Sequence, residues 1–496
     1  MSQTSLPSNT DKNTRDPTPD FWQQGQLVEV TITDLNDTGE GVGRFGGRVV
    51  FVPDTVTSDR VLVRLVRVKS NYAIGKLHQL LEKSPHRIRP SCIVADKCGG
   101  CQWQHIDYSY QLEAKQNLVT QALERIGGFP SPPVAPILSA DTALGYRNKA
   151  TYPLRQSATG HVQAGYYQKG SHQLINLNQC PVQDSRLNPL LAEIKKDIEQ
   201  LGWSVYDERR HQGQLRHLSL RIGRRTGEML LTLVTTDWNL NNLEVQAQTW
   251  LTRYPNLVGV CVNRNPNRTN AIFGDETRCV ASPGANLTGK TTTIADFQRN
   301  RPYLREEFAG LQFHLQPDTF FQVNTEVAEA LLNVIVEQLA LEGDELLVDA
   351  YCGIGTFTLP LAQRVRQAIG IEVQATSVEQ AQLNAQLNGI SNVTFRTGAV
   401  ETVLPQLEVK PDVVLLDPPR KGCVSAADSK TPHTVIDTLL STLPKRIVYV
   451  SCKPATLARD LKLLCQTGSY QLTHIQSADF FPQTPHVECA AFLVRR

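Results

Sequence analysis

Strand and helix patterns alternate through the last third of the chain, and this alternation restricts the possible folds more than any other feature. Helical patterns occur at 324–340 and 377–389. Short apolar strand patterns occur at 345–350, 368–373, 393–398, 412–419 and 446–452. Strands that alternate with helices form a doubly wound parallel sheet. We therefore expect a doubly wound, Rossmann-like α/β domain over residues 309–496.

The segment from Gly25 to about Leu81 has an alternating pattern that is rich in β-branched residues. It predicts four or five short strands, which in so few residues favours a small, OB-like β-barrel. We place this barrel at 22–84. A strand-rich stretch follows, interrupted by a helix around Leu187–Leu201. We expect it to form a β-rich central domain at 85–308.

Composition indicates the number of domains and the expected location of the protein in the cell. The 496 residues suit two to four domains, and no apolar run approaches the roughly 20 residues that a membrane span needs. Residues 1–21 are polar and rich in Pro, Ser and Asn, so we expect a disordered tail rather than a signal peptide. Without an export signal the protein is expected to be cytoplasmic, with its 11 cysteines reduced.

Basic residues are concentrated near the end of the predicted barrel, although the net charge of the whole chain is only +2. Between residues 60 and 90 a single acid, Glu82, accompanies eight basic residues: Arg60, Arg64, Arg67, Lys69, Lys76, Lys83, Arg87 and Arg89. Small barrels bind nucleic acid through a basic face of this kind. A solvated face without a ligand is the alternative interpretation.

A glycine turn follows the first strand of the α/β domain. Asp349 ends the strand, and Gly353 and Gly355 precede a helix. Glycines let a ligand approach the backbone, and Glu372 at the end of the next strand can hold two ribose hydroxyls, although a tight turn without a ligand would also use these glycines. Thr358 replaces the third glycine of the dinucleotide fingerprint. This argues against NAD and favours S-adenosylmethionine, which has no pyrophosphate.

Two further strand ends carry reactive side chains. Asp417, in DVVLLDPPRKG, and Cys452, in RIVYVSCKPATLARDL, are expected at the same end of the sheet. Pro454 is a favourable first residue for a helix, and both the helix N-terminus and Lys453 favour a thiolate at Cys452. With the glycine turn, these features indicate a methyltransferase that has a nucleophilic cysteine.

A thiolate beside a methyl donor suits methylation of uracil at C5. This carbon is a poor nucleophile until a thiolate adds to C6 and generates an enolate, and a base must later remove the C5 proton. Glu488, just before the last strand, is the base that we expect. His486 would lie on the same face of the strand and is the alternative.

A second group of cysteines lies earlier in the chain. Cys92, Cys98 and Cys101 fall within ten residues, and Cys180 is a candidate fourth member. The two glycines between Cys98 and Cys101 free the backbone, so that two thiolates can face one centre. Four thiolates suit either zinc or an iron–sulfur cluster. Unliganded cysteines are the third possibility.

Five segments resemble one known family. FFQVN, DAYCGIG, DPPRKG, VSCKPATLARDL and FFPQTPHVE occur in this order over the last 180 or so residues. They are similar to the motifs of the RNA (uracil-5-)-methyltransferases of the type that acts on 23S rRNA, which are class I enzymes dependent on S-adenosyl-L-methionine. The predicted barrel resembles a TRAM domain, an RNA-binding module.

The resemblance implies roles for particular residues. It implies Cys452 as the nucleophile and Glu488 as the base that takes the C5 proton. The expected contacts of the methyl donor are Gln322, Tyr351, Glu372, Asp417 and Thr356, the last of which stands where the family usually has Asn. The positions that hold a [4Fe-4S] cluster in the family match Cys92, Cys98, Cys101 and Cys180. Methyl transfer needs no electron, so a structural role or a role in RNA folding is expected for this cluster.

The expected substrate is structured RNA, and 23S rRNA is favoured because the related tRNA enzymes typically lack both the TRAM domain and the cluster cysteines. Three alternatives are a tRNA uracil-5-methyltransferase, a non-catalytic iron–sulfur protein that binds RNA, and an N-methyltransferase, which would not need Cys452. Two segments, 282–306 and 423–434, look longer than the family usually has. We expect a monomer and no membrane association.

Overall fold

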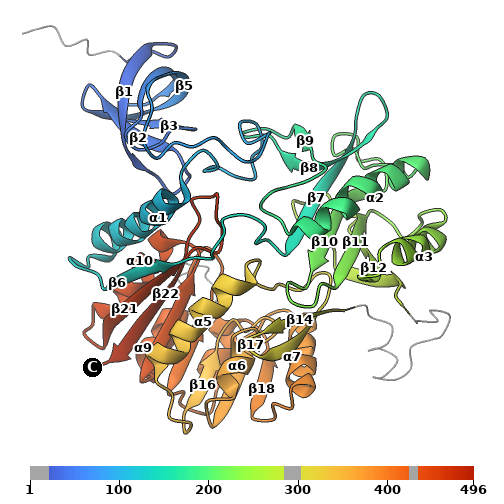
Figure 1. Ribbon diagram of the computed structural model, residues 1–496. Coiled ribbons are helices and arrows are strands. Elements are labelled where there is room, and N and C mark those ends of the chain that lie inside the picture. Colours follow the sequence, from blue (N-terminus) through green and yellow to red (C-terminus); the bar gives the residue numbers. More distant parts are fainter. Residues whose placement is uncertain (1–21, 284–302, 424–433) are drawn as a thin grey trace, which may run out of the picture. The chain divides into compact units, whose positions relative to one another are not determined.

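The computed structural model describes residues 22–283, 303–423 and 434–496. The predicted tail at 1–21 and most of the two long segments, 284–302 and 424–433, lie outside these residues. The chain divides into two compact units, Met1–Arg87 and Ile88–Arg496. Each unit is described separately below (Figure 1).

The first unit is a closed five-stranded barrel in the order β1-β2-β3-β5-β4, as predicted. Its strands are β1 (Leu27–Leu35), β2 (Gly41–Phe45), β3 (Arg48–Val52), β4 (Arg60–Val68) and β5 (Tyr72–Glu82). The interior is filled by β-branched and leucine side chains such as Val30, Val50 and Val63. Alternation along each strand directs these side chains inward and the basic side chains outward.

A seven-stranded sheet forms the first part of the second unit, in the order β13-β12-β11-β10-β7-β8-β9. Its strands are β7 (Lys149–Gln156), β8 (Val162–Tyr167), β9 (Leu174–Asn176), β10 (Leu215–Ile222), β11 (Met229–Thr235), β12 (Leu257–Arg264) and β13 (Glu276–Ala281). Helices α2 (Asn188–Gln200) and α3 (Leu243–Arg253) pack on it through apolar residues that include Ile194 and Trp250. This is the expected β-rich region.

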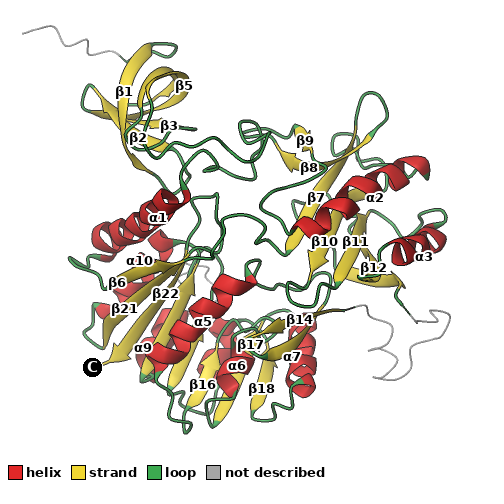
Figure 2. Cartoon of the chain, viewed as in Figure 1, coloured by secondary structure: helices red, strands yellow, loops and turns green. Residues whose placement is uncertain are grey.

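An eight-stranded sheet follows, in the order β18-β17-β16-β19-β20-β22-β21-β6. Its strands are β6 (Val134–Leu138), β16 (Leu346–Asp349), β17 (Gln367–Glu372), β18 (Val393–Thr397), β19 (Val413–Leu416), β20 (Arg446–Ser451), β21 (Tyr470–Ala478) and β22 (Glu488–Arg495). The five strands from β18 to β20 pair in parallel, whereas β22 is antiparallel to both β20 and β21. Figure 2 draws the strands of these two large sheets, like all other strands, in yellow.

Helices cover both faces of this sheet, as the doubly wound prediction requires. Leu347 packs into one core with α5 (Thr325–Leu339), α6 (Thr358–Ala362) and α7 (Ala375–Leu387), whereas Leu346 and Val348 pack into the other core. The second core contains α1 (Tyr108–Ala122), α8 (Val400–Val403), α9 (Val435–Thr442) and α10 (Pro454–Cys465). Alternate residues of a strand point to opposite faces, so apolar residues in succession bury both faces.

Two elements cross the limits that the sequence suggests for the α/β domain. Strand β6 lies within the range 85–308, yet it pairs in parallel with β21 at one side of the eight-stranded sheet. The hairpin of β14 (Leu304–Phe308) and β15 (Leu311–Leu315) spans the expected division at 308/309. Pairing between strands that are distant in sequence has no local signal. Across the three described ranges, none of the helices is long and apolar enough to cross a membrane.

Candidate functional site

Three carboxylates, two of them predicted site residues, lie at or just after strand ends on one side of the eight-stranded sheet. Backbone pairing puts Asp349 of β16 opposite Gly370 of β17 and Leu415 of β19. Glu372 and Asp417 each lie two residues beyond those partners, on neighbouring strands. The parallel strands therefore finish together, and ligands of doubly wound sheets bind outside this carboxyl end.

The turn after β16 has the geometry expected of a ligand-binding glycine turn. Gly353 and Gly355 have φ angles of +53° and +88°, which side chains disfavour. A Cβ atom at Gly353 would meet no atom within 4 Å, so the backbone is open on that side. The Gly353 amide donates to Glu372 Oε2 over 3.2 Å, and the Gln374 amide donates to Glu372 Oε1 over 2.8 Å. These bonds fix the carboxylate beside the turn.

Asp349 and Thr358 form a buried pair under this turn. Thr358 Oγ1 donates to Asp349 Oδ2 over 2.6 Å. Burial raises the pKa of Asp349 to about 6 despite this hydrogen bond. The sequence analysis used Thr358 only as a missing glycine, whereas the structure gives it a bonding partner. The spacing from strand end to helix start is the only signal that could have paired these residues.

The other expected donor contacts lie around the same turn. Tyr351 and Thr356 belong to the turn itself and are half-buried. Gln322 is buried, and its backbone carbonyl oxygen accepts a hydrogen bond from Asn148 Nδ2 over 2.8 Å. Asp417 is half-buried, and burial together with the nearby charge of Asp349 raises its pKa to about 7. Their contacts with a methyl donor remain a prediction.

Cys452 and Glu488 stand opposite each other at the same end of the sheet. Ser451 at the end of β20 pairs with Cys489 of β22, and the two strands are antiparallel. The next residues outward are Cys452 and Glu488. Lys453 is the N-cap of α10, and Pro454 is in its first turn, as the sequence predicted. Because β22 runs in the reverse direction, its first residue reaches the end at which the parallel strands finish.

The electrostatics of this pair differ from the sequence expectation. Burial, followed by the negative charge of Glu488, raises the pKa of the Cys452 thiol, whereas the Arg420 guanidinium lowers it both as a charge and as a hydrogen-bonding partner. Lys453, which was expected to favour the thiolate, is exposed. Burial and the charge of Asp417 also hold the pKa of Glu488 well above its usual range.

Arg420 is thus a site residue that the sequence analysis missed. It follows the two prolines of DPPRKG, and it influences both Cys452 and Glu488. Its place in the DPPRKG motif was the available signal. The alternative base, His486, lies before β22, and its ring contacts Phe481 edge-on with ring centroids 6.1 Å apart. Unlike Glu488, it is not in register with Cys452.

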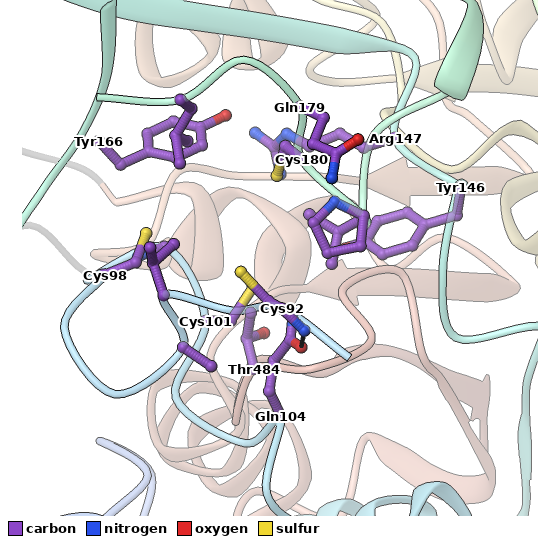
Figure 3. Close-up of a pocket in the computed structure, with 16 residues that line it drawn as sticks. Cys92, Cys98, Cys101, Gln104, Tyr146, Arg147, Tyr166, Gln179, Cys180 and Thr484 are labelled. Carbon is purple, nitrogen blue, oxygen red and sulfur yellow. Dashed lines mark hydrogen bonds between the residues drawn. The ribbon is translucent and has the colours of Figure 1, made fainter. Parts of the chain in front are cut away.

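The four cysteines of the second group line one cavity of about 140 Å³. Figure 3 shows Cys92, Cys98 and Cys101 on one connected loop and Cys180 on a separate segment across the cavity. The Gly99 amide donates to the Tyr167 carbonyl over 2.8 Å, and a Cβ atom there would approach that oxygen to 2.8 Å. A glycine is therefore required at position 99 for this close approach.

The chemistry of this cavity suits thiolate ligation. Burial raises the pKa of Cys101 to about 11 and that of Cys180 to about 12, and neighbouring thiols of the group add to both shifts. A bound cation would stabilise the thiolates and so lower these pKa values. Among the residues that the structure describes, no three His, Cys, Asp or Glu side chains are grouped as ligands of one metal ion.

Comparisons with known proteins agree with the arrangement at the carboxyl end. A family model for tRNA (uracil-5-)-methyltransferase matches residues 299–496. An uncharacterized RNA methyltransferase of Nostoc sp. is 67% identical over 477 residues, which are 96% of this chain and 98% of that protein. The chain belongs to the uracil-5-methyltransferase family of RNA methyltransferases. This confirms the family that the sequence motifs indicated.

Two further comparisons extend over nearly the whole of this methyltransferase. An uncharacterized RNA methyltransferase of Bacillus cereus is 37% identical over 476 residues, 95% of this chain and 97% of that protein. The Pyrococcus abyssi tRNA (uracil-54, C5)-methyltransferase, solved with S-adenosyl-L-homocysteine, superposes with a TM-score of 0.70 at 27% identity, covering 94% of this chain and 100% of that one. A TRAM-domain model matches residues 22–78, which confirms the predicted type of the barrel.

The barrel of the methyltransferase neutralises part of the predicted basic stretch. Arg60 forms ion pairs with both Glu29 and Glu82, and Arg87 forms one with the fully buried Asp59. Glu29 and Asp59 lie outside the 60–90 window, so the sequence count missed them. By contrast, Arg64 of β4 pairs in register with Lys76 of β5, and both side chains are exposed. Like charges directly opposite each other are unfavourable without an anion.

Proposed function

We propose that this protein methylates C5 of uridine in structured RNA, with S-adenosyl-L-methionine as the methyl donor. The single observation that carries the proposal is the register position of Cys452 opposite Glu488, at the end of the sheet where Asp349, Glu372 and Asp417 also lie. A nucleophile and a base are both needed for C5 methylation, and they act on two adjacent atoms, C6 and C5, of one small ring.

The reaction follows from these positions. The Cys452 thiolate adds to C6 of a uracil taken out of its stack, which places negative charge on C5 and O4. A bound donor would supply an electrophilic methyl carbon to C5, and the bond between this carbon and the donor's sulfur would break, which leaves S-adenosyl-L-homocysteine. Glu488 then removes the C5 proton, and the electron pair of that bond expels Cys452 and restores the C5–C6 double bond. The raised pKa of Glu488 makes it a stronger base for this step.

The residues around the glycine turn fit the proposed donor. Gly353 presents an open backbone, and Glu372 keeps lone pairs on both carboxylate oxygens after it accepts one amide bond on each. We assign the donor contacts to Gln322, Tyr351, Thr356, Glu372 and Asp417. The similar Pyrococcus abyssi enzyme was solved with S-adenosyl-L-homocysteine, the demethylated form of this donor, which supports the assignment.

For the RNA target we propose 23S rRNA, with tRNA as the second candidate. The presence of a TRAM domain was the reason to favour rRNA. That reason is weaker than it first looked, because the similar structure named for tRNA covers 94% of this chain and so extends into the N-terminal unit. The four cysteines are the remaining support for the rRNA type.

For the cysteine cavity we propose a [4Fe-4S] cluster held by Cys92, Cys98, Cys101 and Cys180. A single zinc ion needs four sulfurs at about 2.3 Å from one centre. The four thiols line one cavity of about 140 Å³, and a [4Fe-4S] cluster takes one thiolate for each iron. The cavity wall includes Thr484, from the segment that leads to Glu488, so a structural role is consistent with this position.

The proposed function is tested by mapping 5-methyluridine. Ribosomal RNA and tRNA are purified from cells with and without this protein, and nucleosides are located by mass spectrometry of RNase fragments. Loss of one 5-methyluridine in 23S rRNA supports the full proposal, and loss in tRNA supports the second candidate. The purified protein, given S-adenosyl-L-methionine and the unmodified RNA, should restore the same nucleoside. No change in either RNA, with no activity in vitro, would overturn the proposal.

A further inference from the structure

The second half of the segment VSCKPATLARDL has no role in the proposed reaction, yet it contains a fully buried carboxylate. Asp460 lies in α10 and is 0% exposed. Its Oδ2 atom accepts hydrogen bonds from the Tyr449 hydroxyl over 2.7 Å and from the Cys423 amide over 2.8 Å. Its Oδ1 atom accepts from Arg459 Nε over 2.8 Å. One carboxylate therefore joins β20, α10 and the loop that follows β19.

The loop is held against α10 by further contacts. Arg459 Nη2 donates to the Lys421 carbonyl oxygen over 3.0 Å. Gly422 has a φ angle of +78°, and a Cβ atom there would lie 2.5 Å from Asp460 Oδ2 and 2.8 Å from Arg459 Nη2. The backbone of this loop thus rests directly on the Asp460–Arg459 pair. This close approach explains why glycine follows Arg420 and Lys421 in DPPRKG.

Cys452 lies close to the start of the same helix. Helix α10 begins at Pro454, two residues after Cys452, and Asp460 lies within its second turn. Arg420, on the loop that Asp460 holds, is the cation that interacts with the Cys452 thiol. Cys452 thus lies just before the first turn of α10, and the carboxylate that holds the loop of Arg420 lies in its second turn.

We propose that Asp460 is a positioning residue that, together with Arg459, holds loop 420–423 so that the Arg420 guanidinium stays beside Cys452. Its significance for catalysis rests on the proposed role of Cys452 as nucleophile. The position of Arg420 is expected to change the reactivity of the Cys452 thiol in the free protein. It can therefore be tested without RNA or methyl donor, and its failure is distinguishable from failure of the proposed function.

The test is alkylation of Cys452 by iodoacetamide in the full-length protein. The rate is followed by mass spectrometry of the peptide 447–459, in which Cys452 is the single cysteine. In the Asp460→Asn variant we expect alkylation at neutral pH to slow by about three- to tenfold, because a displaced Arg420 no longer favours the thiolate. The pH profile of alkylation should shift to higher pH. Lys462→Ala, at an exposed position of α10, is the matched control and should alkylate at the native rate.

A double-mutant cycle separates positioning from general damage to the fold. Arg420→Met alone should slow alkylation to the same extent, and adding Asp460→Asn to Arg420→Met should slow it no further. Arg459→Met, at a side chain that is 40% exposed, provides a second route if Asp460→Asn fails to fold. An unchanged rate in the folded single variants, or equal slowing by Asp460→Asn with and without Arg420, would overturn the proposal.

Discussion

Cys452 and Glu488 face each other one residue beyond the last backbone pair, Ser451 with Cys489, of two antiparallel strands. Five parallel strands bring their carboxyl ends together, and an antiparallel strand contributes its amino end to the same place. The chain thus assembles a thiol and a carboxyl group from segments separated by α10 and β21. Burial raises the pKa of both groups, so it disfavours the deprotonated form in which each of them reacts.

Replacing Cys452 tests the covalent step. Cys452→Ala should abolish methyl transfer, because the neighbouring thiol, that of Cys489, is fully buried in β22. Binding of S-adenosyl-L-methionine should be nearly unchanged. Tritium transfer to RNA and equilibrium dialysis measure the two properties. Cys465→Ala, at the end of helix α10, is the control. Turnover in the Cys452→Ala variant would refute the covalent mechanism.

Replacing Glu488 should have a different effect. In Glu488→Gln, addition and methylation can proceed while the C5 proton stays, so a methylated RNA–protein adduct should accumulate and survive denaturing electrophoresis. His486→Ala tests the alternative base. If the histidine variant traps the adduct and the glutamine variant does not, His486 is the base and the register argument is wrong.

The pH dependence follows from the sign of the two shifts. Cys452 and Glu488 both act in their deprotonated forms, and burial raises the pKa of each group. Raising the pH therefore increases the fraction of active enzyme, and kcat/KM should climb from pH 6 toward pH 9. On a logarithmic scale the slope at the acid end should be about one to two per pH unit. A decline in kcat/KM between pH 6 and pH 8 would contradict these roles.

The cysteine cavity gives a spectroscopic prediction. Protein purified without oxygen should be brown, with broad absorbance at roughly 400 nm from sulfur-to-iron charge transfer. A serine at any of Cys92, Cys98, Cys101 or Cys180 should remove most of this absorbance, whereas Cys465→Ser should keep it. Iron analysis checks the cluster directly. Colourless protein that contains one equivalent of zinc would instead support the single-ion alternative.

The barrel cations give a prediction about RNA affinity. Arg64→Ala and Lys76→Ala should each weaken RNA binding and reduce the salt slope of the binding constant by about 0.7–0.9. Arg60→Ala is the matched control on the same strand as Arg64, because Glu29 and Glu82 already neutralise Arg60. Fluorescence anisotropy at several salt concentrations measures the slope. Equal slopes for all three variants and the native protein would make the Arg64–Lys76 pair a solvated face.

Local sequence predicted most strands and helices of this protein and the residues at the strand ends, although α3, α9 and β6 were not among the predicted elements. Apolar periodicity, the glycine turn and Pro454 act on near neighbours in the chain, so they located Glu372, Asp417 and Cys452 correctly at the ends of strands. The motifs further indicated the family, because they preserve these local turns together with their reactive side chains.

Only the tertiary structure decided which distant groups meet. The antiparallel entry of β22 beside β20 selected Glu488 over His486 as the group opposite Cys452. Strand order and register depend on pairing between remote segments, which leaves no periodic signal in the sequence. For the same reason, the pairing of Arg60 with Glu29 and the anchoring of the Arg420 loop by Asp460 could not be predicted. The sequence supplies the groups, and nonlocal packing sets their neighbours and hence their charge states.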